Sequence, residues 1–344
     1  MNDLDRLVRP NIAALTPYST ARDEYTGGLG TFLDANESPY DSGFNRYPDP
    51  HQKQLKTQIA ALKGIDPQNL FLGNGSDEAI DLLFRVFCEP GRDEAVAITP
   101  SYGMYSVAAA INNVTLREVP LGPEFSLPTE ALLAATAEPR CKLLFLCSPN
   151  NPTGNAFPRA ELLQLAESFA GITVVDEAYI DFAAEPGLRD ALPEHPRLVI
   201  LQTLSKAWGM AGLRLGLAMA DARIIRLMSM VKYPYNINEA ALRTVSELLR
   251  RPIGEQVREI LRERARVAAA LPALPCVERV YPSDANFLLV RVTNADGVYE
   301  HLVRAGIIVR NRNRVCQCAG CLRLTIGLPA ENDRLLTALA DYAC

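Results

Sequence analysis

The chain has 344 residues, a formal net charge of −5 at pH 7 and a pI near 5.4. This length exceeds the usual size of one hydrophobic core, so we expect two packed units, or one large unit with a lobe, and a cleft between them. No run of Lys and Arg is long enough to follow the phosphates of a nucleic acid. Residues 1–10 lack the apolar stretch of a signal peptide. No segment approaches the ~18 apolar residues of a membrane span. We expect a cytoplasmic protein with no nucleic-acid or membrane partner.

The first forty or so residues are rich in Pro, Gly, Thr and Asn, lack strong periodicity and suggest an arm that packs on something larger. From residue 69 to about 220, short apolar runs alternate with amphipathic stretches. The predicted strands cover residues 96–99, 143–147, 172–175, 198–201 and 215–220, and the predicted helices cover 78–88, 102–111 and 161–170. This alternation predicts an α/β fold with a mostly parallel sheet that helices cover on both faces.

After residue 237 the pattern changes to a long helical region that runs through residue 271. A strand over 287–292, a helix near 299–305 and short strands around Ile307 and Leu322 are expected to follow. This part of the chain predicts a smaller α+β lobe. We therefore divide the chain into an N-terminal arm (1–44), a large domain (45–240) and a small C-terminal domain (241–344).

Lys206 stands in the segment 203–210, which otherwise holds apolar and small residues. An unpaired ammonium is costly to desolvate there, so this lysine needs a partner or a covalent role. A Schiff base with a carbonyl cofactor would supply that role and would use a depressed lysine pKa. A solvated lysine at the rim of a strand is the alternative.

Asp176 ends the apolar run 172–175, and Tyr179 follows one turn later. Ligands of open parallel sheets gather at the carboxyl ends of the strands. An acid placed there could keep a pyridinium nitrogen protonated, as a pyridoxal ring requires, and Tyr179 could donate to the phenolic oxygen of the ring. A helix N-cap or a metal ligand is the alternative for Asp176.

Asn151 lies in the turn 148–154, which two prolines and a glycine make stiff. The turn fixes Asn151 so that its amide could reach a ring oxygen, although an ordinary turn would have the same composition. Upstream, Ser76 and Asp77 lie in a small-residue segment before an amphipathic helix, where backbone N–H groups and the helix dipole favour an anion. Simple helix capping is the alternative for both.

Arg214 lies eight residues after Lys206 among small and apolar residues, and phosphate recognition is its best use.

The order of these motifs along residues 15–328 resembles class I and II aminotransferases, which are pyridoxal-phosphate (PLP) enzymes of fold type I. The resemblance implies that Lys206 carries the cofactor and later moves the substrate proton, and that Asp176 pairs with the pyridine nitrogen. It also implies that Asn151 and Tyr179 bind the ring oxygen. The remaining implied cofactor contacts are Tyr102, which would stack on the ring, and Ser76, Asp77, Ser205 and Arg214, which would surround the phosphate. A core aromatic is the alternative for Tyr102.

Several stretches resemble the histidinol-phosphate aminotransferases in particular: residues 15–18, 33–40 and 45–50. The resemblance implies that Tyr47 reaches the cofactor phosphate of a neighbouring subunit, so the active form would be a homodimer with its site at the interface. It also implies that Tyr18 and Asn36 line the substrate pocket. The reaction would be transamination between L-histidinol phosphate and 2-oxoglutarate in histidine biosynthesis.

Arg310 and Arg323 fall on two predicted neighbouring strands, and the resemblance assigns both to substrate anions. A guanidinium fork can bind either a carboxylate, as in glutamate, or a phosphate. A surface salt bridge is the alternative for Arg310. Between the two arginines, Cys316, Cys318 and Cys321 depart from the family pattern. No fourth ligand for zinc is evident, so we expect no metal, and we interpret this loop as one with easily oxidised thiols.

Other functions fit parts of this pattern. A threonine-phosphate decarboxylase or an aromatic amino acid aminotransferase would share the fold and most motifs. A non-catalytic PLP-binding regulator is a different class, and the intact lysine, aspartate and arginine set argues against it. A nicotinamide dehydrogenase is disfavoured because the G-x-G-x-x-G spacing is missing.

Overall fold

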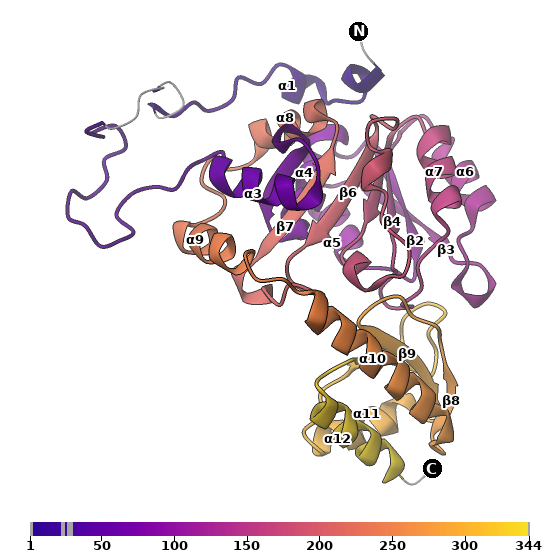
Figure 1. Cartoon of the computed structure of the whole chain (residues 1–344). Coiled ribbons are helices and arrows are strands. Elements are labelled where there is room, and N and C mark those ends of the chain that lie inside the picture. The colour runs from indigo at the N-terminus through magenta and orange to yellow at the C-terminus, as the bar shows by residue number, and fades with distance from the viewer. Residues whose placement is uncertain (1–2, 22–24, 26–29, 343–344) are drawn as a thin grey trace.

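The computed structural model describes residues 3–21, 25 and 30–342, and within them the strands form two sheets (Figure 1). The larger sheet has seven strands in the described chain, in the order β1-β7-β6-β5-β4-β2-β3. Its strands are β1 (Leu70–Asn74), β2 (Glu94–Thr99), β3 (Thr115–Pro120), β4 (Cys141–Cys147), β5 (Ile172–Asp176), β6 (Leu198–Thr203) and β7 (Leu215–Ala220). The smaller sheet has the order β10-β11-β9-β8, with β8 (Val277–Val280), β9 (Phe287–Val292), β10 (Arg310–Asn311) and β11 (Cys321–Thr325).

The direction of the strands decides which chain segments meet at one edge of the large sheet. Strands β2 to β6 pair in parallel, and β7 runs antiparallel to both of its neighbours, β6 and β1. The carboxyl ends of β1 to β6 therefore lie at the same edge, and β7 begins there. Ligands of open α/β sheets bind at this edge, so the chain topology brings the segments after β1, β2, β4, β5 and β6 to one place.

Helices cover both faces of the large sheet, as continuous apolar strands such as β4 and β6 require. One face packs against α4 (Ser76–Phe87), α5 (Met104–Ile111) and α8 (Ala222–Val231). The other packs against α3 (Lys53–Lys63), α6 (Thr129–Thr136), α7 (Arg159–Ser168) and α9 (Glu239–Leu248). Alternate residues of one strand enter the two cores: Val96 and Ile98 enter one, whereas Ala95 and Ala97 enter the other.

The small sheet lies at the other end of the long helix α10 (Gly254–Ala270), below the large sheet in Figure 1. One of its faces packs against α10, α11 (Ala295–Arg304) and α12 (Pro329–Ala340) through a separate apolar core. The opposite face holds Leu289 and Cys321, which belong to a core of the large sheet. The expected fold class, a large mostly parallel α/β body with a smaller α+β one, is confirmed.

The N-terminal segment has two parts. A short 3-10 turn (Asp3–Arg6) and α1 (Pro10–Ala13) fix the chain to the large body through the buried side chains of Leu4, Val8 and Ile12. The described chain then runs away from the body before it returns at α3 (Figure 1), and Leu33 and Tyr40 on this run are more than 80% exposed. The boundaries proposed for the arm and the two domains stay a prediction.

The elements differ from the expected ones in the small lobe and at the sheet edges. The helical region expected through residue 271 is two helices, α9 and α10, with a break between them. The strand expected around Ile307 is wrong, because the strand that pairs with β11 begins at Arg310. Strands β1, β3 and β8 and helices α8 and α12 were not singled out in the sequence.

Candidate active site

Two adjacent cavities open at the carboxyl edge of the large sheet. The first has a volume of about 600 Å³ and reaches from the start of α5 to the hairpin of β10 and β11. The second is enclosed by the segments that follow β1, β5 and β6. Both are lined by Tyr102, Asn151, Tyr179 and Lys206, so they form one continuous cleft.

Asp176 is the last residue of β5 and lies buried at the floor of the cleft. Its Oδ2 accepts a hydrogen bond of 2.8 Å from the Tyr105 hydroxyl, and its Oδ1 accepts one of 3.0 Å from the backbone N–H of Ala178. Burial raises the pKa of Asp176 to about 6, and the hydrogen bond from Tyr105 acts against this increase. A cation facing this carboxyl group would keep it ionised at neutral pH.

Lys206 follows β6 and points into the cleft beside Asp176 and Tyr179. Its Nζ lies 5.5 Å from the centre of the Tyr179 ring, which packs edge-on against Phe287 of the small sheet. Burial, and next the charge of Arg323, lower the pKa of the Lys206 ammonium. A larger fraction of this lysine is therefore the neutral amine than of a solvated lysine, which is the form that attacks a carbonyl carbon.

The amino end of α4 forms the wall of the cleft opposite Asp176. Gly75 is the N-cap residue, with φ +78°, so neither Ser76 nor Asp77 caps the helix with its side chain. A Cβ added to Gly216 of β7 would lie 2.0 Å from the backbone nitrogen of Ser76. Only glycine allows β7 to approach this helix end, which exposes backbone N–H groups in a position that favours a bound anion.

Arg214 and Tyr102 approach the same helix end. Arg214 lies immediately before β7, with φ +54° and a half-exposed side chain whose Nη2 is 3.6 Å from Asp77. The Tyr102 hydroxyl donates a hydrogen bond of 2.9 Å to Asp77. Ser205 lines the same cavity, and its hydroxyl lies 3.0 Å from that of Thr203. The structure therefore brings together Ser76, Asp77, Tyr102, Asn151, Asp176, Tyr179, Ser205, Lys206 and Arg214, as expected.

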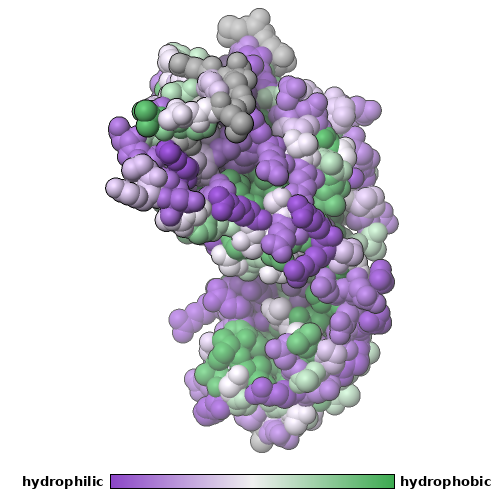
Figure 2. All heavy atoms as spheres, turned by 60° about the vertical axis from the view of Figure 1, so that its left-hand side comes forward, coloured by the Kyte–Doolittle hydropathy of each residue, from purple (hydrophilic) through white to green (hydrophobic). Residues whose placement is uncertain are grey.

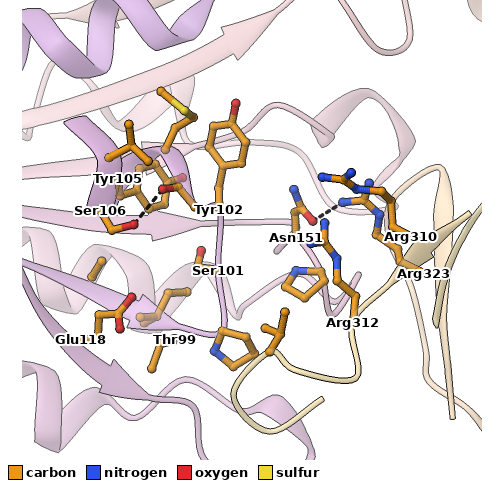
Figure 3. Close-up of a pocket in the computed structure, with 18 of the residues that line it drawn as sticks. Thr99, Ser101, Tyr102, Tyr105, Ser106, Glu118, Asn151, Arg310, Arg312 and Arg323 are labelled. Carbon is orange, nitrogen blue, oxygen red and sulfur yellow. Dashed lines mark hydrogen bonds between the residues drawn. The ribbon is translucent and has the colours of Figure 1, made fainter. Parts of the chain in front are cut away.

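Arginines of the small sheet form the far wall of the larger cavity (Figure 3). Arg310 of β10 pairs directly with Arg323 of β11. The Arg323 guanidinium donates a hydrogen bond to the amide oxygen of Asn151, and it lies 5.1 Å from the centre of the Phe287 ring. Burial lowers the pKa of Arg323. The structure thus places two predicted anion-binding residues across the cleft from the lysine.

Three other predicted site residues lie outside this cleft within the single chain. Tyr18 is 74% exposed on the arm. Asn36 and Tyr47 line a separate hollow, where the Tyr47 ring stacks on Tyr235 with 4.5 Å between ring centres. Figure 2 shows the molecule narrowing between its larger body, whose visible face is mostly hydrophilic, and its smaller body, which shows a hydrophobic patch. The roles expected for these three residues stay predictions, and the role expected for Tyr47 requires a second subunit.

The cysteines between the two arginines differ from the expected oxidisable loop. Cys316 is exposed, but Cys318 and Cys321 are fully buried. Burial raises the pKa of the Cys318 thiol to about 12 and also raises that of Cys321, so neither is a ready thiolate at neutral pH. The expectation of easily oxidised thiols is wrong for these two. Among the described residues, no group of three or more His, Cys, Asp or Glu side chains is placed to hold a metal ion.

Two residues of the cleft were missed in the sequence. Tyr105, whose hydroxyl holds Asp176, lies in α5 and gave no signal beyond the periodicity of a core aromatic. Arg312 lines the larger cavity beside Arg310. The i, i+2 spacing of these two arginines could have found it, because alternate residues of a strand share a face.

Comparisons with known proteins place this cleft in a family. The family model "Aminotransferase class I and II" matches residues 32–339. The chain belongs to the class I and II aminotransferases. The aminotransferase is 54% identical over 343 residues to the histidinol-phosphate aminotransferase of Parabacteroides distasonis, with 99% of each chain covered. It is 50% identical over 345 residues to that of Bacteroides thetaiotaomicron, again with 99% of each chain covered.

Solved structures agree in fold. The histidinol-phosphate aminotransferase of Clostridium acetobutylicum superimposes on the aminotransferase with a TM-score of 0.80 at 24% identity, covering 87% of this chain and 90% of that one. The enzyme of Sinorhizobium meliloti, solved in complex with pyridoxal-5′-phosphate, gives a TM-score of 0.78 at 25% identity and covers 86% and 82% of the two chains. In the described residues of this aminotransferase, no helix is long and apolar enough to cross a membrane.

The cleft fits PLP, the cofactor of this enzyme family. A lysine of lowered pKa suits the aldehyde, and a buried acid of raised pKa suits the pyridine nitrogen. The helix end that Gly216 leaves open suits the phosphate. The lysine, the acid and the helix end line one cavity, because each follows a strand that ends at the same edge of the sheet.

Proposed function

We propose that this aminotransferase exchanges the amino group of L-histidinol phosphate with 2-oxoglutarate, giving imidazole-acetol phosphate and glutamate in histidine biosynthesis. The observation that supports it most is the pair Arg310 and Arg323, which faces Lys206 across one cavity. Anion-binding groups opposite the reactive amine suit substrates that carry a phosphate or a carboxylate. The relatives that match along nearly the whole chain bear the corresponding name.

PLP supplies an aldehyde that condenses with amines and a ring that withdraws electrons. Asp176 would hold the pyridine nitrogen in its protonated form, and Tyr105 and the N–H of Ala178 fix the carboxyl group in place. Asn151 and Tyr179 would donate to the ring oxygen, and Tyr102 would lie against the ring. The residues that would bind the phosphate are Ser76, Asp77, Ser205 and Arg214, helped by the dipole of α4.

Lys206 has two tasks at the same atom. Its Nζ would hold the cofactor covalently and would take up the proton that leaves the substrate carbon. Both tasks require a neutral amine, and the lowered pKa of Lys206 favours that form. The nearby positive charge of Arg323 contributes to this lowered pKa, which links the amine to the group that holds the substrate anion.

Arg310 and Arg323 hold the anionic end of either substrate and so fix the reacting carbon near Lys206. The same forks bind the phosphate of histidinol phosphate in one half of the reaction and a carboxylate of glutamate in the other. Exclusion of other amines then depends on the length and shape of the cavity.

A substrate panel on the purified protein tests this function. We expect turnover of L-histidinol phosphate with 2-oxoglutarate to exceed that of phenylalanine by a large factor, with one glutamate formed per amine consumed. Release of carbon dioxide from threonine phosphate, without glutamate formation, would instead identify a decarboxylase. Faster turnover of phenylalanine than of histidinol phosphate would identify an aromatic amino acid aminotransferase.

We further propose that the active form is a cytoplasmic homodimer in which Tyr47 reaches the partner's cofactor phosphate. The exposed arm and the position of Tyr47 outside its own cleft support this assembly. Mixing inactive Lys206→Ala and impaired Tyr47→Ala subunits at limiting cofactor tests it. In an equal mixture about half of the dimers are mixed, and each mixed dimer would have one intact site of two. About a quarter of wild-type activity should therefore return. No recovery, with mixed dimers present, would place Tyr47 elsewhere.

A further inference from the structure

The hairpin of β10 and β11 presents three arginines, not two, to the substrate end of the cleft. Arg310 pairs with Arg323, and the backbone N–H of Arg312 continues the ladder with a 2.9 Å hydrogen bond to the carbonyl of Cys321. Because side chains alternate along a strand, Arg310 and Arg312 point to the same face. The intervening Asn311 points away and donates a 2.7 Å hydrogen bond to Asp296 on α11.

Arg312 lines the cavity with Lys206 and is half-buried. Its Nε is buried, and within the described chain it has no hydrogen-bond acceptor. Burial, and then the charges of Arg323 and Arg310, lower the pKa of its guanidinium. An arginine in such a position costs folding free energy unless an anion compensates it, and Figure 3 shows its guanidinium turned toward Asn151 and the other two arginines.

The neighbouring arginine on the same hairpin provides the contrast. Arg314 is exposed and does not line the cavity. The two residues share a chain segment and a charge, but only Arg312 faces the site. The position of Arg312 in the cavity, and not only the positive charge of the hairpin, therefore suits it to bind a ligand anion.

We propose that Arg312 is a third anion-binding side chain, which makes the site prefer a dianionic phosphate over a carboxylate. This inference rests on the proposed function and names what determines its specificity. A carboxylate has two oxygens and one charge, which one guanidinium fork satisfies. A phosphate ester has three free oxygens and up to two charges, so it can accept hydrogen bonds from a further arginine. The third arginine thus contributes mainly when the substrate is phosphorylated.

Steady-state kinetics of the holoenzyme provide the test. In Arg312→Gln, the KM for histidinol phosphate should rise about tenfold or more, as expected for the loss of a hydrogen bond between charged groups. The KM for glutamate should change by less than about threefold. The matched control Arg314→Gln removes the same charge from the same hairpin and should leave both values unchanged. Equal effects of Arg312→Gln and Arg314→Gln, or equal losses for both substrates, would overturn the proposal.

A binding measurement separates this inference from the function on which it rests. Inorganic phosphate is titrated by calorimetry into the holoenzyme, whose cofactor phosphate site is filled. Arg312→Gln should weaken its binding about tenfold relative to Arg314→Gln, whether or not the wild-type enzyme turns over histidinol phosphate. Unchanged phosphate affinity overturns the role of Arg312, whereas absent turnover with changed affinity overturns only the proposed substrate.

Folding of the variants is controlled by the visible absorbance of the bound cofactor and by the Tm. If Arg312→Gln does not fold, the same KM measurements are made on Arg312→Lys. This variant keeps the positive charge but loses the planar guanidinium fork. Arg312→Lys should raise the KM for histidinol phosphate and leave that for glutamate unchanged. Wild-type KM values for both substrates in Arg312→Lys would contradict the proposed contact.

Discussion

The hydroxyl of Tyr105 donates a 2.8 Å hydrogen bond to Oδ2 of Asp176, and both side chains are buried. Tyr105 belongs to α5, so a helix after β2 fixes the acid at the end of β5. The hydrogen bond favours the ionised carboxylate, whereas burial favours the neutral acid. Burial has the larger effect, and the pKa of Asp176 is raised to about 6.

This raised pKa predicts how the stability of the cofactor-free protein depends on pH. A carboxyl group whose pKa is higher in the folded than in the unfolded state favours folding most at low pH, and this contribution is lost as the pH rises through the folded pKa. Between pH 5 and pH 7 the free energy of unfolding should fall by roughly 1 kcal/mol because of this group alone. Chemical denaturation of the apoprotein and of Asp176→Asn measures the difference, which should be absent from the variant. An identical pH dependence of both proteins would show that Asp176 does not titrate in this way.

Replacement of Lys206 by alanine tests the covalent site. The variant should lose the visible absorbance of the lysine-bound cofactor, and its kcat should fall by about three orders of magnitude or more, because proton transfer is also lost. Absorbance spectra and single-turnover rates measure the two effects separately. The exposed Lys53 offers a control, and Lys53→Ala should keep both. A normal lysine-bound spectrum in Lys206→Ala would refute the assignment.

Arg323 should serve both substrates. Arg323→Lys keeps the charge but loses the planar fork, so we expect kcat/KM for histidinol phosphate and for glutamate to fall together, by about tenfold to a hundredfold. The kcat/KM of each half-reaction is the measurement. A loss confined to one substrate would show that the two anions bind at different places.

Gly216→Ala should disturb the phosphate end of the cleft. The added Cβ would lie 2.0 Å from the Ser76 nitrogen and 2.2 Å from the Gly75 carbonyl carbon, and neither backbone atom can move without shifting α4. We expect a loss of about 1 to 3 kcal/mol in stability and weaker cofactor binding. Denaturation curves and cofactor titration measure both. Gly212→Ala, where an added Cβ meets no atom within 4 Å, is the matched control.

The central strands could be predicted from the sequence because a sheet buried on both faces requires continuous apolar runs. The predicted runs reach within two residues of the ends of β2, β4, β5, β6 and β7. Strand β3 was missed because it lies at the edge of the sheet, where Arg117 and Glu118 interrupt the apolar pattern. Strand β1 was missed because it ends in Gly73 and Asn74, which give it a turn-like composition.

The cofactor end of the cleft could be predicted for a similar reason. Its residues follow strand ends, and parallel topology alone brings strand ends together. The substrate end could not be predicted as fully. Arg312 becomes visible only once the register of β10 against β11 is known, and the burial of Cys318 depends on how the small sheet meets the large one. Tyr18 and Tyr47 lie outside the cleft of the single chain, so their expected roles stay predictions.

The hydrogen bond from Arg323 to Asn151 joins the small sheet to the turn after β4. Asn151 lines both cavities, so this bond joins the two ends of the cleft. An anion that takes the same N–H group of Arg323 has to replace the amide oxygen. By thermodynamic linkage, any change that strengthens the resting bond weakens the hold on the ligand to the same degree. Affinity for such an anion is therefore set partly by Asn151, which holds the guanidinium before the anion arrives.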